Sequence, residues 1–311
     1  MSVFTGVTAE LVLDTRNETG ESPVWRVAEQ ALYWVDIPAR CLQRWSSRDG
    51  KVTRWNTPEA ISCLAPTQYA KQWLAGSEAG IAHITLMSET ALDFRCVTLA
   101  EHAQPHMRFN DGRCDRQGRF LAGTMVWDGR NGAGAKTGAI YQLDSDGALH
   151  KLLNGFRRPN GLAFSPDGRT MYLSDSHPDE RMVWVYDYDV HTGTPTNARP
   201  FIDMADFAGR PDGAAVDTDG CYWICGTDAG LVHRYTPQGQ LDYSVRVPVA
   251  KPSMCAFGGS DLRTLYITSM RSSAASDPSA PDGGVFAIHL PSVQGLPEPA
   301  YSHSRSRSDS Q

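Results

Sequence analysis

Four side chains that carry oxygen ligands recur at equivalent points of a repeated sequence pattern. Each stands just where a short apolar segment typical of a β-strand begins. Together with two serines they are spaced 41 to 52 residues apart, at Glu21, Ser62, Asn110, Asn160, Asp212 and Ser253. Buried charges must be paired with an opposite charge or bound to a metal. If these side chains converge, the two carboxylates and two amides therefore predict a site for a divalent cation.

A simpler interpretation exists for any one of these residues. Short polar side chains form turns and cap backbone groups at the start of a strand, so a single Asn or Asp needs no further explanation. This interpretation does not account for Glu21, whose side chain is longer, or for the recurrence of the whole set. We therefore keep the metal hypothesis, which requires a fold that brings the six positions together.

The repeated pattern itself indicates such a fold. Segments rich in β-branched and aromatic residues occur six times, at 31–36, 72–77, 119–124, 171–176, 221–227 and 264–269. A further strand-like segment follows each of them, and Asp-Gly or Gln-Gly turn signals connect several neighbouring strands. Six units of about four short strands predict an all-β fold, a six-bladed β-propeller with four antiparallel strands per blade. The innermost strands of a propeller surround a central channel, where the six positions would meet.

The ends of the chain determine how this ring closes. The sixth unit lacks a convincing fourth strand, and we expect the N-terminal segment 9–13 to supply it, which would remove an exposed edge. We expect a single propeller domain over residues 1–292. Residues 293–311 are rich in Ser and Pro and end without apolar side chains, so we expect a disordered tail there.

Composition and charge exclude several classes of function. The net charge is −6, with acids and bases interspersed, so no basic stripe suggests a nucleic-acid partner. No apolar stretch approaches the roughly 20 residues of a membrane-spanning helix, and the N-terminus lacks signal-peptide features, so we expect no membrane partner and a cytoplasmic location. Among the 7 cysteines only Cys221 and Cys225 lie close together, and we expect both to be buried thiols. The pattern gives no indication of oligomeric state.

Four motifs in this order resemble a known family. The segments 20–25, 108–112, 159–162 and 211–213 are similar to those of the SMP-30/gluconolactonase/LRE family of regucalcin-like sugar lactonases, over about residues 8–292. The resemblance implies a six-bladed propeller that holds one divalent metal ion in its channel and hydrolyses aldonolactones. It implies Glu21, Asn160 and Asp212 as metal ligands. Such an oxygen-rich site suits Ca²⁺ or Zn²⁺, with Mg²⁺ or Mn²⁺ as alternatives.

The same resemblance implies three residues that contact substrate. Arg108 corresponds to an arginine that contacts the substrate, and Asn110 would face the substrate and a water on the metal. Asp128 stands in a loop where relatives often carry an acid. The sequence around Asp128 departs from the family's acidic run, and this residue could equally begin a turn with Gly129.

These residues together suggest a mechanism for opening a small sugar lactone. A channel cation can polarise the lactone carbonyl and lower the pKa of bound water. Asp212 is our candidate for the catalytic base, and a metal-bound hydroxide is the alternative. A paraoxonase-like esterase is a second enzyme hypothesis. Because propellers host many functions, a non-catalytic propeller that binds calcium or a protein is a third, and metal-dependent turnover would distinguish it from the enzymes.

Overall fold

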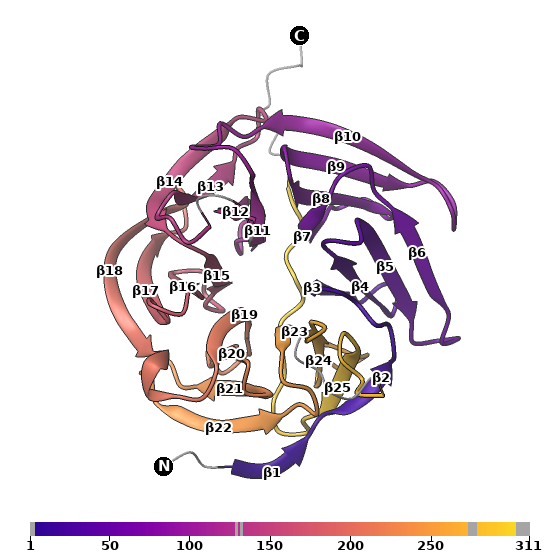
Figure 1. Cartoon of the computed structure of the whole chain (residues 1–311), viewed down its shortest axis with the longest axis vertical. Helices are drawn as coiled ribbons and strands as arrows, with labels where there is room; N and C mark the ends of the chain where they lie inside the picture. The colour runs from indigo at the N-terminus through magenta and orange to yellow at the C-terminus, as the bar shows by residue number, and fades with distance from the viewer. Residues whose placement is uncertain (1–3, 128–129, 131–132, 273–278, 303–311) are drawn as a thin grey trace.

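Six β-sheets surround a central axis in the computed structural model, which describes residues 4–127, 130, 133–272 and 279–302 (Figure 1). The sheets are the blades of a propeller, and in the described residues the only helix is the 3₁₀ turn η1 (Met204–Asp206). This arrangement confirms the predicted six-bladed all-β fold. None of the described residues form a helix with the length and apolar character that a membrane crossing requires.

The first three blades are each formed by four consecutive strands, with the innermost strand first. Blade one contains β3 (Gly20–Arg26), β4 (Ala31–Asp36), β5 (Cys41–Ser46) and β6 (Val52–Asn56). Blade two contains β7 (Ile61–Pro66), β8 (Gln72–Ser77), β9 (Gly80–Leu86) and β10 (Leu92–Leu99). Blade three contains β11 (Met107–Cys114), β12 (Phe120–Val126), β13 (Gly138–Leu143) and β14 (Leu149–Phe156). The strands within each blade are antiparallel, as predicted.

The second half of the ring repeats this order until the last blade. Blade four contains β15 (Pro159–Phe164), β16 (Thr170–Asp175), β17 (Met182–Asp189) and β18 (Thr194–Asp203). Blade five contains β19 (Arg210–Val216), β20 (Tyr222–Thr227), β21 (Leu231–Tyr235) and β22 (Leu241–Arg246). Blade six has only three consecutive strands, β23 (Pro252–Gly258), β24 (Thr264–Ser269) and β25 (Val285–His289).

The N-terminal segment completes the ring and extends it. Strand β2 (Glu10–Leu13) pairs antiparallel with β25 and becomes the fourth strand of blade six, which confirms the predicted closure. Strand β1 (Phe4–Thr8), which we did not predict, adds to β22 of blade five in parallel orientation. Between them Ala9 is buried, and its N–H donates to the Arg246 carbonyl at 2.8 Å. One short segment thus connects two blades.

The C-terminal segment departs from the expected tail. Residues 293–302 cross the middle of the ring from blade six toward blades two and three (Figure 1). Gly295 bridges Asp217, Tyr301 bridges Thr67, and the Ser302 N–H donates to the Gly118 carbonyl at 3.0 Å. The expected disorder therefore does not describe residues 293–302, because partners from other blades satisfy their backbone groups. Residues 303–311 lie outside the described residues.

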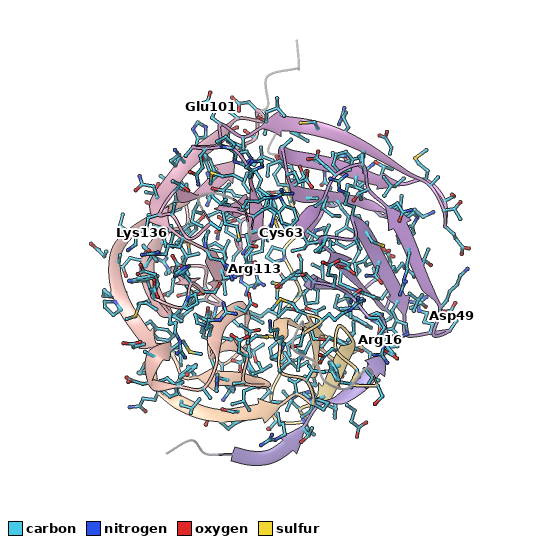
Figure 2. The ribbon with its side chains drawn as sticks, in the orientation of Figure 1. Arg16, Asp49, Cys63, Glu101, Arg113 and Lys136 are labelled. Atoms are coloured by element: carbon cyan, nitrogen blue, oxygen red, sulfur yellow. The ribbon has the colours of Figure 1, made fainter. Side chains whose placement is uncertain are left out.

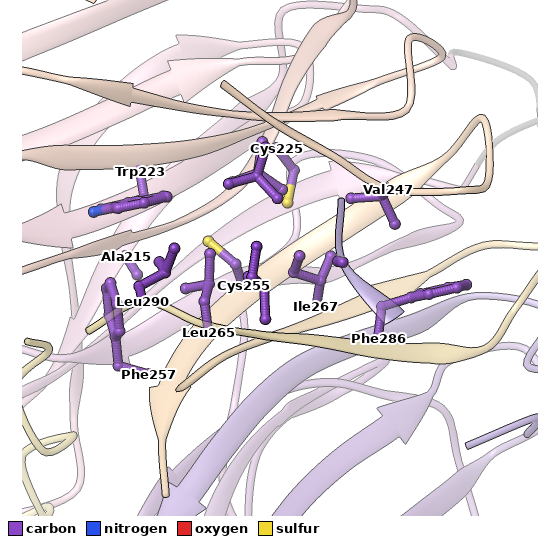
Figure 3. Close-up of a cluster of buried hydrophobic side chains, with 14 of the residues drawn as sticks. Ala215, Trp223, Cys225, Val247, Cys255, Phe257, Leu265, Ile267, Phe286 and Leu290 are labelled. Atoms are coloured by element: carbon purple, nitrogen blue, oxygen red, sulfur yellow. The ribbon is translucent and has the colours of Figure 1, made fainter. Parts of the chain in front are cut away.

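Apolar cores fill the spaces between adjacent blades. The core between blades five and six contains Trp223 and Phe286 together with the two cysteines Cys225 and Cys255 (Figure 3). Cys221 and Cys225 are both buried and free, as we predicted. Burial raises the pKa of the Cys225 thiol well above its ordinary value, and the neighbouring Cys255 adds to this effect. These thiols therefore act as small apolar side chains.

Candidate metal and substrate site

All six innermost strands shift their pairing register at the same point. Each irregularity begins at the predicted position or encloses it, between Glu21/Val24, Ile61/Cys63, Phe109/Gly112, Asn160/Ala163, Pro211/Ala214 and Pro252/Cys255. A β-bulge bends its strand and redirects side chains, and bulges are common beside active sites. The repeated bulge therefore sets the direction of the six side chains, which we call the ring residues: Glu21, Ser62, Asn110, Asn160, Asp212 and Ser253.

Side chains of neighbouring blades satisfy the backbone groups that the bulges release. Ser22 Oγ accepts a hydrogen bond from the Leu64 N–H at 2.8 Å, and Asp111 Oδ2 accepts one from the Leu162 N–H at 2.8 Å. In both pairs the residue after one ring residue binds the backbone of the next blade. Buried N–H groups need such partners. These contacts therefore fix neighbouring ring residues relative to one another.

The negative charge of Asp212 acts on the carboxyl group of Glu21 in the channel. Burial raises the pKa of Glu21 well above its ordinary value, and the negative charges of Asp212 and Asp111 raise it further. Burial also raises the pKa of Asp212, to about 7, against the opposing effect of two nearby arginines. The third predicted ligand, Asn160, is buried, and its Nδ2 donates to Ser176 Oγ at 2.9 Å. This bond engages the amide nitrogen of Asn160, so the amide oxygen is the atom that we predict as a metal ligand.

This set of donors fits an oxygen-preferring cation. Buried carboxylates of like charge require a positive charge near them, and the buried Asp111 Oδ1 has no hydrogen-bond partner among the described residues. Within the part of the chain that the structure describes, no three or more His, Cys, Asp or Glu side chains are grouped so that they could hold a metal ion. The predicted ligand set contains only two such side chains, Glu21 and Asp212. Its third member is the amide Asn160, so it is not a group of this kind.

Arg108 lies beside these carboxylates and is held in a defined orientation. Its Nη1 donates to Asn110 Oδ1 and to the Phe109 carbonyl, both at 2.7 Å. Its guanidinium lies 4.6 Å from the ring centre of Trp127, at a distance typical of a cation–π contact. Asn110 is anchored in turn, because its Nδ2 donates to the Pro159 carbonyl at 3.1 Å. The structure thus brings Arg108 and Asn110 together, whereas Asp128 lies outside the described residues.

A pocket of about 450 Å³ opens beside Trp127, between blades one, two and three, and its lining includes Arg40, Glu78 and Met107. A larger pocket of about 860 Å³ lies at the other end of β7, where Thr67 and Tyr301 line it. We place the site at the end of the channel near Trp127, because the ring residues and Arg108 lie at that end of the innermost strands.

Sequence reasoning missed several residues near this site. Asp111 follows Asn110 directly, and the alternation of a regular strand would turn its side chain away from the channel. The bulge removes that alternation, so the Asp111 charge acts on both Glu21 and Asp212. Arg113 also lies near the channel centre (Figure 2), where its Nη2 donates to the Ala214 carbonyl at 2.7 Å. No side-chain pattern in the sequence marks these bulges.

The model of the SMP-30/gluconolactonase/LRE-like region matches residues 19–271. The chain belongs to this family. Its resemblance to the family, inferred from the four motifs, is thereby confirmed.

Relatives in this family match along nearly the whole chain. A 6-deoxy-6-sulfogluconolactonase of Pseudomonas putida is 38% identical over 95% of this chain and 99% of its own length. An L-arabinolactonase of Azospirillum brasilense is also 38% identical, over 89% of this chain and 90% of its own. Among solved structures, a regucalcin of Agrobacterium tumefaciens described as a calcium-binding protein is 28% identical, with a TM-score of 0.86 over 95% of this chain and 98% of its own.

Proposed function

We propose that this protein is a metal-dependent lactonase that hydrolyses a sugar lactone to the free sugar acid. The observation that carries the proposal is the grouping of two carboxylates, the partly buried Glu21 and the buried Asp212, with the oriented Arg108 at one end of the channel. Membership of the SMP-30/gluconolactonase/LRE-like family supports it. So do the relatives named as lactonases, which cover nearly the whole chain.

Glu21, Asn160 and Asp212 would hold the metal ion, which we propose to be Ca²⁺ or Zn²⁺. The likeness to a structure described as a calcium-binding protein supports a divalent ion. When bound, such an ion supplies a positive charge that polarises a carbonyl and makes a water molecule more acidic. Glu21 and Asp212 carry the negative charge of this set of three ligands, and this charge is the physical reason to expect a cation between them.

The chain's own residues account for the remaining steps. Asp212 would accept a proton from the water whose oxygen bonds to the lactone carbonyl carbon. The bond from that carbon to the ring oxygen would then break, and the ring oxygen would take the proton held by Asp212 to become a hydroxyl. Arg108 would donate hydrogen bonds to substrate oxygens, because its contacts with Asn110 and Trp127 fix the guanidinium in advance.

An assay of acid release over a panel of sugar lactones tests the proposal. The protein is first treated with a chelator, and Ca²⁺, Zn²⁺, Mg²⁺ and Mn²⁺ are then added back singly. We expect metal-dependent opening of at least one lactone. If no lactone is opened with any metal while calcium still binds, the non-catalytic calcium-binding propeller replaces this proposal, and turnover of aryl esters alone would favour the esterase.

A substitution at Asp212 tests its assigned role. We expect Asp212→Asn to lower kcat/KM by roughly 100-fold or more, as loss of a general base typically does, and to weaken metal binding measured by calorimetry. Asp187→Asn, which changes an exposed carboxylate on blade four, is the matched control and should leave both quantities unchanged. Near wild-type turnover of the Asp212 variant would refute the role of this residue.

A further inference from the structure

The larger pocket, of about 860 Å³, lies between blades two and three and away from the ring residues. It reaches Thr67, just beyond the end of β7, whereas the ring residue Ser62 stands near the start of that strand. At about 3.3 Å per residue the two positions are roughly 16 Å apart. The pocket has a volume within the range of roughly 300–1,000 Å³ that is usual for small-molecule sites. A molecule bound there is therefore a different one from a substrate at the ring residues.

The two faces of blade two differ beside this pocket. On the face toward blade one, the paired row across β8, β9 and β10 is apolar and belongs to the core between blades one and two: Trp73, Ile84 and Phe94. On the face toward blade three, the adjacent paired row is Leu74, His83 and Arg95, and all three line the pocket. Only Leu74 is buried, because His83 is half-buried and Arg95 is exposed. Blade three therefore does not cover this row.

The row changes from apolar to cationic across the blade. Neighbouring strands lie about 4.8 Å apart, so the row spans about 10 Å from β8 to β10. Leu74 belongs to the apolar core between blades two and three together with Leu143, and Tyr301 of the C-terminal segment packs against this core. At the other end of the row, the Arg95 side chain forms no ion pair or hydrogen bond with any residue that the structure describes. The pocket thus joins an apolar wall to a cation.

His83 stands between these two ends in its neutral form. Burial lowers the pKa of His83, and the charge of Arg95 lowers it further, while the charge of Asp93 opposes both effects. A neutral imidazole has one nitrogen that donates and one that accepts a hydrogen bond. Across the pocket, the carboxylate of Asp146 is engaged by its own turn, because its Oδ1 accepts the Ala148 N–H at 3.1 Å. Arg95 therefore supplies the charge that is available to a ligand.

Two tyrosines line the same pocket. Tyr69, on the turn between β7 and β8, is 59% exposed, which is unusual for a large aromatic side chain with no partner to cover it. The hydroxyl of Tyr301 donates to the Asp144 carbonyl at 3.3 Å, and this bond helps to place its ring at the pocket wall. Aromatic rings pack well against one another in stacked or edge-to-face arrangements. These side chains favour a planar, aromatic ligand.

We propose that this pocket is a second binding site, which takes an aromatic carboxylate. The ring system of the ligand packs on Leu74 and Leu143 beside the two tyrosines, and its carboxylate pairs with Arg95. A guanidinium group matches a carboxylate with two parallel hydrogen bonds. The inference adds a ligand to this protein and does not depend on the proposed lactonase function.

Calorimetric titration of the full-length protein with naphthylacetate tests the inference. We expect this acid to bind at one site per chain. Its neutral amide, naphthylacetamide, should bind at least about 10-fold more weakly, as expected for the loss of hydrogen bonds between charged groups. Acetate, which lacks the ring system, should not bind measurably. If naphthylacetate does not bind, or if the amide binds equally well, the inference is wrong.

Cys96 provides a local readout of the pocket. It lines the pocket and is exposed, whereas the other six cysteines are buried. The neutral reagent N-ethylmaleimide should therefore label Cys96 first. With naphthylacetate at ten times its dissociation constant, we expect labelling to slow by about 10-fold, because only the unoccupied protein reacts. An unchanged labelling rate at this concentration would show that the acid binds elsewhere and would refute the inference.

Substitutions at the pocket connect binding to its residues. We expect Arg95→Gln to weaken binding of the acid by roughly 10-fold or more and to leave binding of the amide unchanged, and Arg95→Lys to have a smaller effect. Tyr69→Ala should weaken binding of both compounds. Arg199→Gln is the matched control, because Arg199 is exposed on the outermost strand of blade four as Arg95 is on that of blade two. All of these side chains are exposed, so Tm should not change. Equal affinity of Arg95→Gln and wild type for the acid would contradict the role of Arg95.

Kinetics separate this site from the channel. For a lactone that the metal-loaded protein opens, naphthylacetate should leave KM unchanged while it protects Cys96. Competitive inhibition without protection of Cys96 would place the acid in the channel and refute the second site. Failure to open any lactone would refute the proposed function alone, because binding and labelling are measured without turnover.

Discussion

The orientation of Arg108 depends on a side chain that no motif indicated. Trp127 follows the end of β12 and packs against the core between blades one and two, while the Arg108 guanidinium lies over its ring at 4.6 Å. The hydrogen bonds from Arg108 Nη1 to Asn110 and to Phe109 hold one edge of the guanidinium. Trp127 fixes its plane, and we regard it as a positioning residue.

Replacement of Trp127 by leucine should therefore impair substrate use without loss of metal. A cation–π contact contributes about 0.5–2 kcal/mol, so we expect Trp127→Leu to lower kcat/KM by roughly 2- to 30-fold. Trp127→Phe keeps an aromatic face and should retain most of the activity. Steady-state kinetics and metal titration check this, and an unchanged kcat/KM in the leucine variant would show that the ring does not orient Arg108.

His233 is a buried histidine whose protonation should oppose folding. Its Nε2 lies 3.0 Å from the Ala208 carbonyl and its Nδ1 lies 2.7 Å from Ser244 Oγ, so a neutral ring that donates through Nε2 satisfies both contacts. Burial lowers the pKa of His233 below its ordinary value, although the bond to Ala208 opposes this. The unfolded chain therefore binds the proton first as the pH falls.

This difference gives the stability of the protein a pH dependence below about 6.5, the ordinary pKa of histidine. The free energy of unfolding should fall with decreasing pH in this range, by at most about 1.4 kcal/mol per pH unit from this residue. We expect His233→Gln to be less stable at pH 7 and to lose less stability between pH 7 and pH 5.5. Urea unfolding at several pH values measures this, with His191→Gln on an exposed turn as the control. Parallel curves for wild type and His233→Gln would contradict the prediction.

Whether a site residue can be recognised from the sequence depends on the regular alternation of side chains along its strand. The ring residues could be found because each begins a strand of a repeated unit. Asp111 could not be found in this way, because its role depends on the bulge and a regular strand would turn it outward.

At the scale of elements, the strands were predictable and their irregularities were not. Local turn signals and apolar segments determine where a strand lies, and six repeats of them identified the blades. A bulge depends on the pairing of two strands and on contacts from the next blade. The Tyr222 hydroxyl, for example, donates to the Gly161 carbonyl at 2.7 Å, directly after Asn160 in the bulge of blade four.

Gly161 should therefore be more sensitive to substitution than a glycine whose φ is also positive but whose surroundings are open. Its φ is 65°, and a Cβ there would lie 2.5 Å from Tyr222 Oη and 2.8 Å from Ser174 Oγ. Gly155 has φ 87° with no atom within 4 Å of such a Cβ, and is the matched control. Both alanine variants incur about 1–2 kcal/mol of backbone strain, but Gly161→Ala should lose a further 1–3 kcal/mol by overpacking. Equal losses in denaturant unfolding would mean that the bulge adapts to the added methyl group.

At the scale of the whole molecule, the C-terminal segment could not be interpreted from its own sequence. It has no strand or helix periodicity, and few apolar residues identify it as part of a core. Its partners lie in distant blades. Val293 is buried in the core between blades five and six, and Glu298 lies 3.8 Å from the buried Arg113 near the channel centre. The segment joins blade six to blades two and three across one end of the channel.

Removal of this segment should therefore destabilise the entire ring. A chain that ends at residue 292 loses the burial of Val293 and leaves Arg113 without Glu298, although Asp111 remains near it. Removing one partner of a buried ion pair costs about 3–5 kcal/mol, which corresponds to a decrease in Tm of about 6 °C or more for a domain of this size. A chain that ends at residue 302 keeps every contact described above and should unfold like the full protein.

Thermal unfolding followed by circular dichroism compares the full protein with the chains that end at residues 292 and 302. An unchanged Tm after truncation at 292 would show that the segment covers the channel without stabilising the propeller, whereas a loss reproduced by Glu298→Gln alone would assign most of the effect to the Arg113 pair.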